Sequence, residues 1–125
     1  DEALNYYFKV ELIDSNNTRA WRSIAWCAFL SRKFDIAQRY YSRILDNKPN
    51  THDFLNAGHV ELCLSNNRYA VKLYEQSLKE AGSFDTFLRM LRDDVDELLE
   101  AGVDTDILPV IVDKMLYDSD ESESK

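Results

Sequence analysis

The sequence predicts an all-α protein built as an array of stacked helix pairs, and two observations support this fold. An alanine followed four positions later by tyrosine recurs at nearly constant spacing, with successive copies 34 and 33 residues apart: Ala3–Tyr7, Ala37–Tyr41 and Ala70–Tyr74. Apolar residues around these pairs recur at steps of three and four, the period of an amphipathic helix. Self-similarity at this length is typical of stacked helical hairpins, in which each pair completes the core of its neighbour.

Residues 18–50 contain one complete unit. The apolar face of its first helix is made of Trp21, Ile24, Ala25 and Ala28. After a polar turn at residues 31–33, a second helix carries the apolar stripe Phe34, Ala37, Tyr41, Ile44 and Leu45. Pro49 closes the unit because proline cannot continue a helix, and it favours extended backbone at Lys48.

Residues 51–82 contain a second complete unit with a weaker pattern. Its first helix carries Phe54, Ala57 and Gly58, and its second carries Ala70, Val71, Tyr74 and Leu78. Gly58 provides the small residue that closely approaching helices require, and Gly82 ends the second helix through a positive φ. Residues 1–15 match only the second helix of a unit. We therefore expect a partial repeat there and a chain that is a C-terminal fragment of a longer array; a simple N-terminal capping helix is the alternative.

These motifs resemble the tetratricopeptide repeat, which carries W-x2-L-G-x2-Y on its first helix and A-x3-F before a proline on its second. Trp21, Ile24, Ala25 and Ala28 occupy the four positions of the first motif, where Ala28 departs from the tyrosine. Ala37, Tyr41 and Pro49 occupy the small, aromatic and proline positions of the second. The resemblance covers residues 3–82 and implies a tetratricopeptide-like α-solenoid, a right-handed superhelical stack of antiparallel helix pairs.

Residues 83–117 are predicted to form a cap of two helices. The first runs from Phe84 to a stop near Gly102, with apolar residues Phe84, Phe87, Leu88, Leu91, Val95 and Leu98. The second begins at Asp104 or Thr105 and carries Ile107, Leu108, Ile111, Val112, Met115 and Leu116. Residues 118–125 are acidic, rich in serine and without apolar side chains, so a disordered tail is expected.

Charge is distributed unevenly along the chain. Residues 1–90 hold 12 basic and 11 acidic residues, whereas residues 91–125 hold 3 and 12, which gives the net charge of −8. The nearest approach to a basic patch is Arg32, Lys33, Arg39 and Arg43, which belong to a turn and a solvated helix face. Nucleic acid is therefore not an expected partner.

Membrane contact is not expected from this segment either, because no apolar run reaches spanning length. Cys27 and Cys63 are too few for a disulfide framework and suit a reducing compartment. We expect a cytoplasmic protein, and a signal peptide upstream of the fragment stays open.

Motifs for catalysis are sparse. The chain has 3 glycines and contains neither G-x-S-x-G nor H-E-x-x-H, so no cofactor and no enzymatic activity are predicted. One alternative remains, a metal-dependent enzyme. His59 and Cys63 share a helix face at a spacing of four, and Cys27 could supply a third ligand. Two ligands on one helix make only half of a zinc site, so this alternative is the weaker one.

The resemblance implies a function in protein–protein interaction, as a scaffold or adaptor that binds an unidentified peptide or protein. In the resembled family, first helices line the concave face and contact the ligand. Carried over to this sequence, the partner-binding residues are Arg19, Arg22, Trp26, Phe29, Leu55, Asn56, His59 and Leu62. No lysine lies on either first helix, so the carboxylate clamp of chaperone-tail receptors is not matched. Two alternatives stay open: the C-terminal helices fill this groove, or the chain forms a homodimer through its N-terminal or C-terminal helix.

Overall fold

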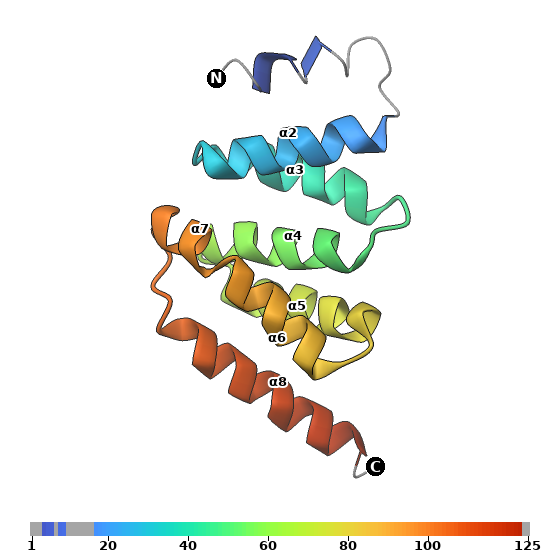
Figure 1. The fold of residues 1–125 in the computed structure, drawn as a ribbon, viewed down its shortest axis with the longest axis vertical. Helices are drawn as coiled ribbons and strands as arrows, with labels where there is room; N and C mark the ends of the chain where they lie inside the picture. The colour runs from blue at the N-terminus through green and yellow to red at the C-terminus, as the bar shows by residue number, and fades with distance from the viewer. Residues whose placement is uncertain (1–3, 7, 10–16, 124–125) are drawn as a thin grey trace.

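The computed structural model describes residues 4–6, 8–9 and 17–123, with side chains as far as Tyr117. Every regular element in these ranges is a helix, which confirms the predicted all-α class (Figure 1). The helices are α2 (Thr18–Leu30), α3 (Phe34–Leu45), α4 (Thr51–Cys63), α5 (Asn67–Ala81), α6 (Phe84–Asp93), α7 (Val95–Glu100) and α8 (Ile107–Glu123).

Helices pack mainly against their neighbours in the chain. The closest partners are α2 with α3 and α4 with α5, followed by α3 with α4 and α5 with α6. Figure 1 shows the pair α2–α3 above the pair α4–α5, with α6 in front of α5 and α8 below. Helix α8 contacts α5, and one apolar core runs from Leu4 through the helix pairs to Met115.

Small residues and tyrosines form the contacts between helices. Ala37 and Ala70 are fully buried, and the side chains of Tyr41 and Tyr74 are 3% and 0% exposed. A Cβ atom added at Gly58 would lie 2.6 Å from Cε1 of Tyr74, closer than van der Waals contact permits. Gly58 therefore lies at a close helix approach, as the sequence predicts.

The helix ends follow from local side-chain chemistry. The side chains of Asn17 and Ser83 accept hydrogen bonds from the backbone N–H groups of Ala20 and Thr86, at 3.0 and 3.1 Å. Gly82 holds a φ of 80° after α5, which confirms the predicted stop. Side-chain capping of this kind satisfies backbone donors that have no partner within the helix.

Some turn residues other than glycine also adopt the left-handed backbone conformation. Arg32 and Ser65 hold φ values of 61° and 64° just after α2 and α4. Lys48 holds a φ of 54°, so the prediction of extended backbone before Pro49 is wrong. Five residues must reverse the chain between α3 and α4, and a left-handed residue makes so short a reversal possible.

The C-terminal cap differs from its prediction. The single helix expected from Phe84 to Gly102 is two helices, because the chain leaves the helical conformation at Asp94, with φ −101° and ψ 1°. The carboxylate of Asp94 bonds to His59 on α4, so a tertiary contact accompanies the break. The cap therefore contains three helices.

Helix α8 continues to Glu123, in contrast to the disordered tail expected from Asp118. Extending an existing helix costs far less than starting one, and glutamate is a good helix former. Residues 124–125 lie outside the described residues.

Most of the partial repeat predicted at 1–15, including Ala3 and Tyr7, also lies outside the described residues. Within it, Leu4 is 2% exposed, and the ring of Phe8 lies 6.2 Å from that of Tyr40.

Candidate functional site

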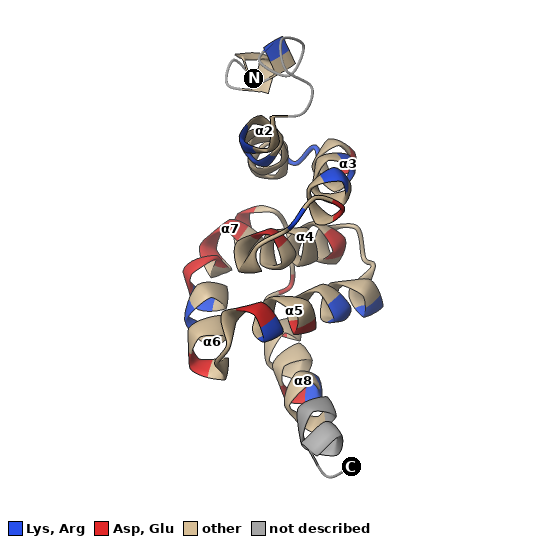
Figure 2. Cartoon of the chain, turned by 90° about the vertical axis from the view of Figure 1, so that its right-hand side faces the viewer, with Lys and Arg blue, Asp and Glu red and all other residues tan. Residues whose placement is uncertain are grey.

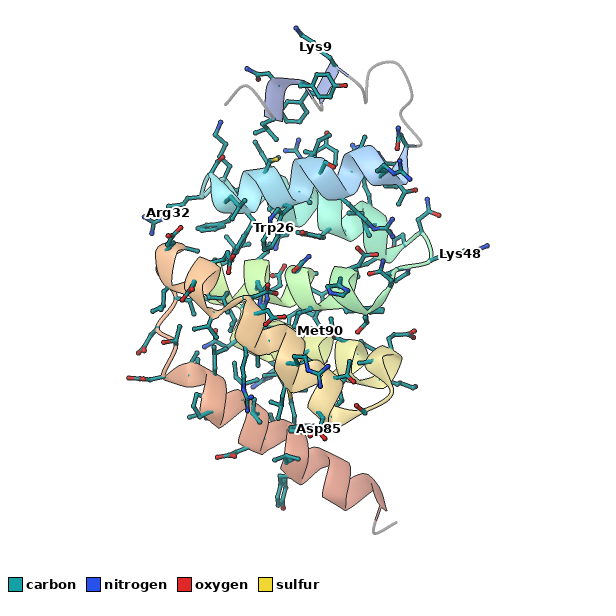
Figure 3. All side chains as sticks on the ribbon, in the orientation of Figure 1. Lys9, Trp26, Arg32, Lys48, Asp85 and Met90 are labelled. Atoms are coloured by element: carbon teal, nitrogen blue, oxygen red, sulfur yellow. The ribbon has the colours of Figure 1, made fainter. Side chains whose placement is uncertain are left out.

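A pocket of about 380 Å³ opens between α2 and α4 and contains three of the eight predicted partner-binding residues. We call it the α2–α4 pocket. It is lined by Arg22, Ser23, Trp26, Tyr41, Asn50, His52, Asp53 and Asn56. Figure 3 shows the side chain of Trp26 between α2 and α4. Arg22 and Trp26 come from one first helix and Asn56 from the next, so the structure brings together residues that the sequence places 30 or more positions apart.

An ion pair joins the two helices at this pocket. Arg22 donates two hydrogen bonds to the carboxylate of Asp53, with Nε 2.9 Å from Oδ1 and Nη2 2.8 Å from Oδ2. The hydrogen bond to Asp53 raises the pKa of Arg22, although partial burial acts in the opposite direction. Planar two-bond pairing of this kind fixes the orientation of both side chains.

Asp53 also caps α4. Its Oδ2 accepts a bond from the backbone N–H of Asn50 at 2.9 Å, and the side chain of Asn50 accepts one from the N–H of Asp53 at 2.9 Å. The carboxylate is 3% exposed and fully engaged. The cationic group at the pocket is thus already neutralised by a carboxylate of the same chain.

Two aromatic residues, Trp26 and Tyr41, belong to the pocket lining. Trp26 stacks on Phe29 with ring centroids 5.2 Å apart and an interplanar angle of 23°. Phe29 itself is 1% exposed, so its ring supports Trp26 from within the core. Burial raises the pKa of Tyr41 far above its usual range, and a hydrogen bond to Asn56 opposes part of that shift.

Four of the predicted partner-binding residues are buried. Phe29, Leu55 and His59 are at most 1% exposed, and Leu62 is 7% exposed. They have no surface to offer a partner in this conformation, and they contribute to the core. Arg19 is exposed on α2, but it does not line the pocket.

His59 is the centre of a buried polar network that links three parts of the fold. Its Nδ1 lies 2.7 Å from the hydroxyl oxygen of Tyr74 on α5, and its Nε2 lies 2.9 Å from Oδ2 of Asp94 between α6 and α7. A neutral imidazole protonated at Nε2 satisfies all three groups, since it donates to the carboxylate and accepts from the tyrosine. Burial raises the pKa of Tyr74 well above its usual range, so its hydroxyl remains a donor.

The structure assembles no ligand set for the metal alternative in the part of the chain that it describes. Groups of three or more histidine, cysteine, aspartate or glutamate side chains placed to hold a metal ion are not found there. Both ring nitrogens of His59 already have hydrogen-bond partners. Cys63 is half-buried, and burial raises its pKa to about 11, which favours the thiol over the metal-binding thiolate.

Sequence reasoning missed five residues of the pocket: Ser23, Tyr41, Asn50, His52 and Asp53. One signal was available, because Asn50 and Asp53 have the spacing and residue types of a capping box. That pattern places Asn50 at the start of α4 and therefore at the mouth of a groove beside its first turn. The sequence places Tyr41 on the apolar stripe of the second helix, and its side chain is buried as that position predicts.

Comparisons with known proteins give no relative for this chain: no family model, no curated protein and no solved structure matches it significantly. The resemblance to the tetratricopeptide repeat therefore stays a prediction that rests on the residues themselves. Among the helices of the described ranges, none combines the length and apolar character needed to cross a bilayer.

Proposed function

We propose that residues 1–82 form a tetratricopeptide-like superhelical stack and that the chain is a protein-binding module without catalytic activity. The packing of successive helices against one another supports the stack, as does the contact between Gly58 and Tyr74. The bound partner is a peptide or a protein segment that enters the α2–α4 pocket.

One observation carries this proposal. Arg22, Trp26 and Asn56 were selected from the sequence as partner-binding residues on two successive helices, and they line the same pocket. Large aromatic side chains supported from below are the usual anchors of protein interfaces. The Asn56 amide offers a donor and an acceptor for a peptide backbone, and the exposed His52 adds a polar group at the mouth.

The ligand chemistry follows from the state of the ion pair. Because Arg22 is neutralised by Asp53, the pocket has little net charge to attract an acidic anchor. The best fit is an extended segment that presents an aromatic or aliphatic side chain to Trp26 and backbone amides to Asn56.

Selection from a random-peptide display library on the purified chain tests the proposal. Synthetic copies of the enriched peptides are then titrated by fluorescence anisotropy against wild type, His52→Ala and Trp26→Ala. We expect Trp26→Ala to weaken binding about tenfold or more, the effect of losing an interface anchor. His52→Ala should weaken it less, and Tyr6→Ala, which removes an aromatic side chain 63% exposed elsewhere, should leave it unchanged.

Far-ultraviolet circular dichroism and thermal unfolding of each variant check that the substitution has not disrupted the fold. His52→Ala serves as the safer variant, because His52 is exposed and outside the core. If no peptide is enriched, or if the enriched peptides bind all variants with equal affinity, the α2–α4 pocket is not a binding site.

A further inference from the structure

A second pocket, of about 480 Å³, lies among α3, α4 and α5, and we call it the α3–α5 pocket. Its lining includes two arginines of α3, Arg39 and Arg43. The lining also contains a set of apolar or aromatic side chains from all three helices: Leu45, Ala57, Tyr69 and Leu73. Nothing in the proposed peptide-binding function uses these residues.

The mouth of this pocket is cationic. Arg39 and Arg43 are both exposed and lie one helical turn apart on α3. Arg43 lies over the ring of Tyr40, with Cζ 4.8 Å from the ring centroid, which helps to hold its position. Figure 2 shows basic segments on α3 and α5 on the side away from α7, whose ribbon is largely acidic.

The carboxylate of Glu61 also belongs to the pocket lining, but it already accepts hydrogen bonds from neighbouring side chains. Glu61 is 4% exposed and accepts hydrogen bonds from the side-chain amides of Gln38, at 3.0 and 3.1 Å, and Asn66, at 2.8 Å. Glu61 is thus buried in the pocket wall, whereas Arg39 and Arg43 are exposed lining residues. The pocket therefore favours an occupant with apolar side chains followed by carboxylates.

The end of α8 has this chemistry. Leu116 and Tyr117 are 42% and 63% exposed although both are apolar or aromatic. The residues that follow them, 118–123, have the sequence Asp-Ser-Asp-Glu-Ser-Glu. In both views the described part of α8 runs away from α3 (Figures 1 and 2).

We propose that the C-terminal end of α8 from a second copy of this chain docks into the α3–α5 pocket. Leu116 and Tyr117 pack against the apolar wall, and the carboxylates that follow pair with Arg39 and Arg43. Bonds between guanidinium and carboxylate are charge-assisted and therefore among the stronger polar contacts. The two surfaces differ, so the contact is head-to-tail and builds either an open chain or a closed ring.

Sedimentation velocity of the full chain at increasing concentration tests this proposal, at about 25 mM and about 500 mM NaCl, because salt screens exposed charge pairs. We expect the weight-average sedimentation coefficient to rise with concentration at low salt and to return towards the monomer value at high salt. The double variant R39E/R43E should weaken association about tenfold or more. The control K79E/R89E changes net charge equally at exposed positions outside the pocket and should retain association.

A charge exchange identifies the occupant. The variant D118K/D120K/E121K should associate as weakly on its own as R39E/R43E does, and a mixture of the two should recover association, because each supplies the charge that the other lacks. A chain that stays monomeric at low salt overturns the proposal. So does association that R39E/R43E weakens no more than the control, association that salt strengthens, or a mixture that fails to recover. None of these outcomes depends on peptide binding in the α2–α4 pocket.

Discussion

The paired helices α2–α5 and the short helix α7 of the C-terminal cap are held in different ways. The paired helices bury continuous apolar faces against each other, with alanine, glycine and tyrosine at the contacts. In the cap, α7 buries one side chain besides the alanine at its end, and polar bonds tie it to the rest. These bonds join His59 to Asp94 and Arg32 to the carbonyl oxygen of Ala101. Figure 3 shows Arg32 just after the end of α2, beside the turn that follows α7.

This difference indicates that the two regions have different local stability. Apolar packing spread over many residues fails as a unit, whereas an element held by a few polar contacts can open alone. We therefore expect the α7 region to open before the paired helices unfold, and the following predictions test that order.

The largest effect is expected from Tyr41→Ala. Tyr41 is 3% exposed between the helix pairs, and deletion of a buried aromatic side chain costs about 3–5 kcal/mol of unfolding free energy. Urea denaturation followed by circular dichroism measures the loss. Tyr6→Ala, at a site 63% exposed, should change stability by less than about 0.5 kcal/mol. A loss below about 1 kcal/mol for Tyr41→Ala would contradict its role in the core.

The substitution Asp94→Ala should loosen the α7 region without destabilising the paired helices. The change leaves Nε2 of the buried His59 without an acceptor, at a cost of about 1–3 kcal/mol. Cys63 reports the opening because it lines a pocket of about 390 Å³ with Ala101, Val103 and Ile107 from the cap. In a Cys27→Ala background, thiol labelling of Cys63 should accelerate about 5-fold or more.

The midpoint of urea unfolding for the paired helices should change little in the same Asp94→Ala variant. Asp96→Ala, which removes an exposed carboxylate two residues further along, is the matched control. Equal labelling rates in the two variants would show that the bond between His59 and Asp94 does not hold the cap.

A smaller effect is expected from Asp53→Ala within the paired helices. The change removes the capping box of α4 and the pairing with Arg22 together. We expect a loss of about 1–2 kcal/mol, typical of a helix cap, with little added by the ion pair because Arg22 is partly exposed to water. Asp35→Ala, at an exposed first-turn position of α3, is the control in urea denaturation. Equal losses would mean that Asp53 is not a specific cap.

The smallest effect is a dependence on alkaline pH. Burial raises the pKa of the Cys63 thiol from 9.0 to about 11, so the folded state holds this proton more tightly than the unfolded state. The resulting stabilisation is complete below about pH 9 and is lost as the pH rises from 9 to 11. The urea midpoint should therefore fall less over this interval in Cys63→Ala than in wild type. An equal fall of the urea midpoint in the two proteins would mean that the Cys63 thiol is exposed to water in the folded state.

The sequence predicted the paired helices well because their determinants are local. Three local signals locate these helices without knowledge of distant contacts. They are the apolar residues at steps of three and four, the small residues at fixed spacing and Gly82 after α5. The break at Asp94 was not predictable in this way. Its carboxylate bonds to His59, which lies 35 positions earlier, and nothing in the neighbouring residues signals that contact.

The candidate site was predicted in part for a related reason. Helical periodicity showed which residues share a face of α2 or α4, and it correctly grouped Arg22 with Trp26. It could not show which part of that face the core covers. Phe29, Leu55 and His59 were therefore grouped with accessible residues, although all three are buried. The ring of Phe29 packs near those of Phe34 on α3 and His59 on α4, and the ring of His59 packs near that of Tyr74 on α5.

Tyr41 lines both pockets. If a peptide that enters from the α2 side displaces this ring, it also reshapes the surface that a second copy would meet. Thermodynamic linkage makes such an influence mutual: whatever factor the first ligand imposes on the affinity of the second, the second imposes on the first. Through the Tyr41 side chain, the proposed association between copies of the chain would then depend on whether the proposed peptide is bound.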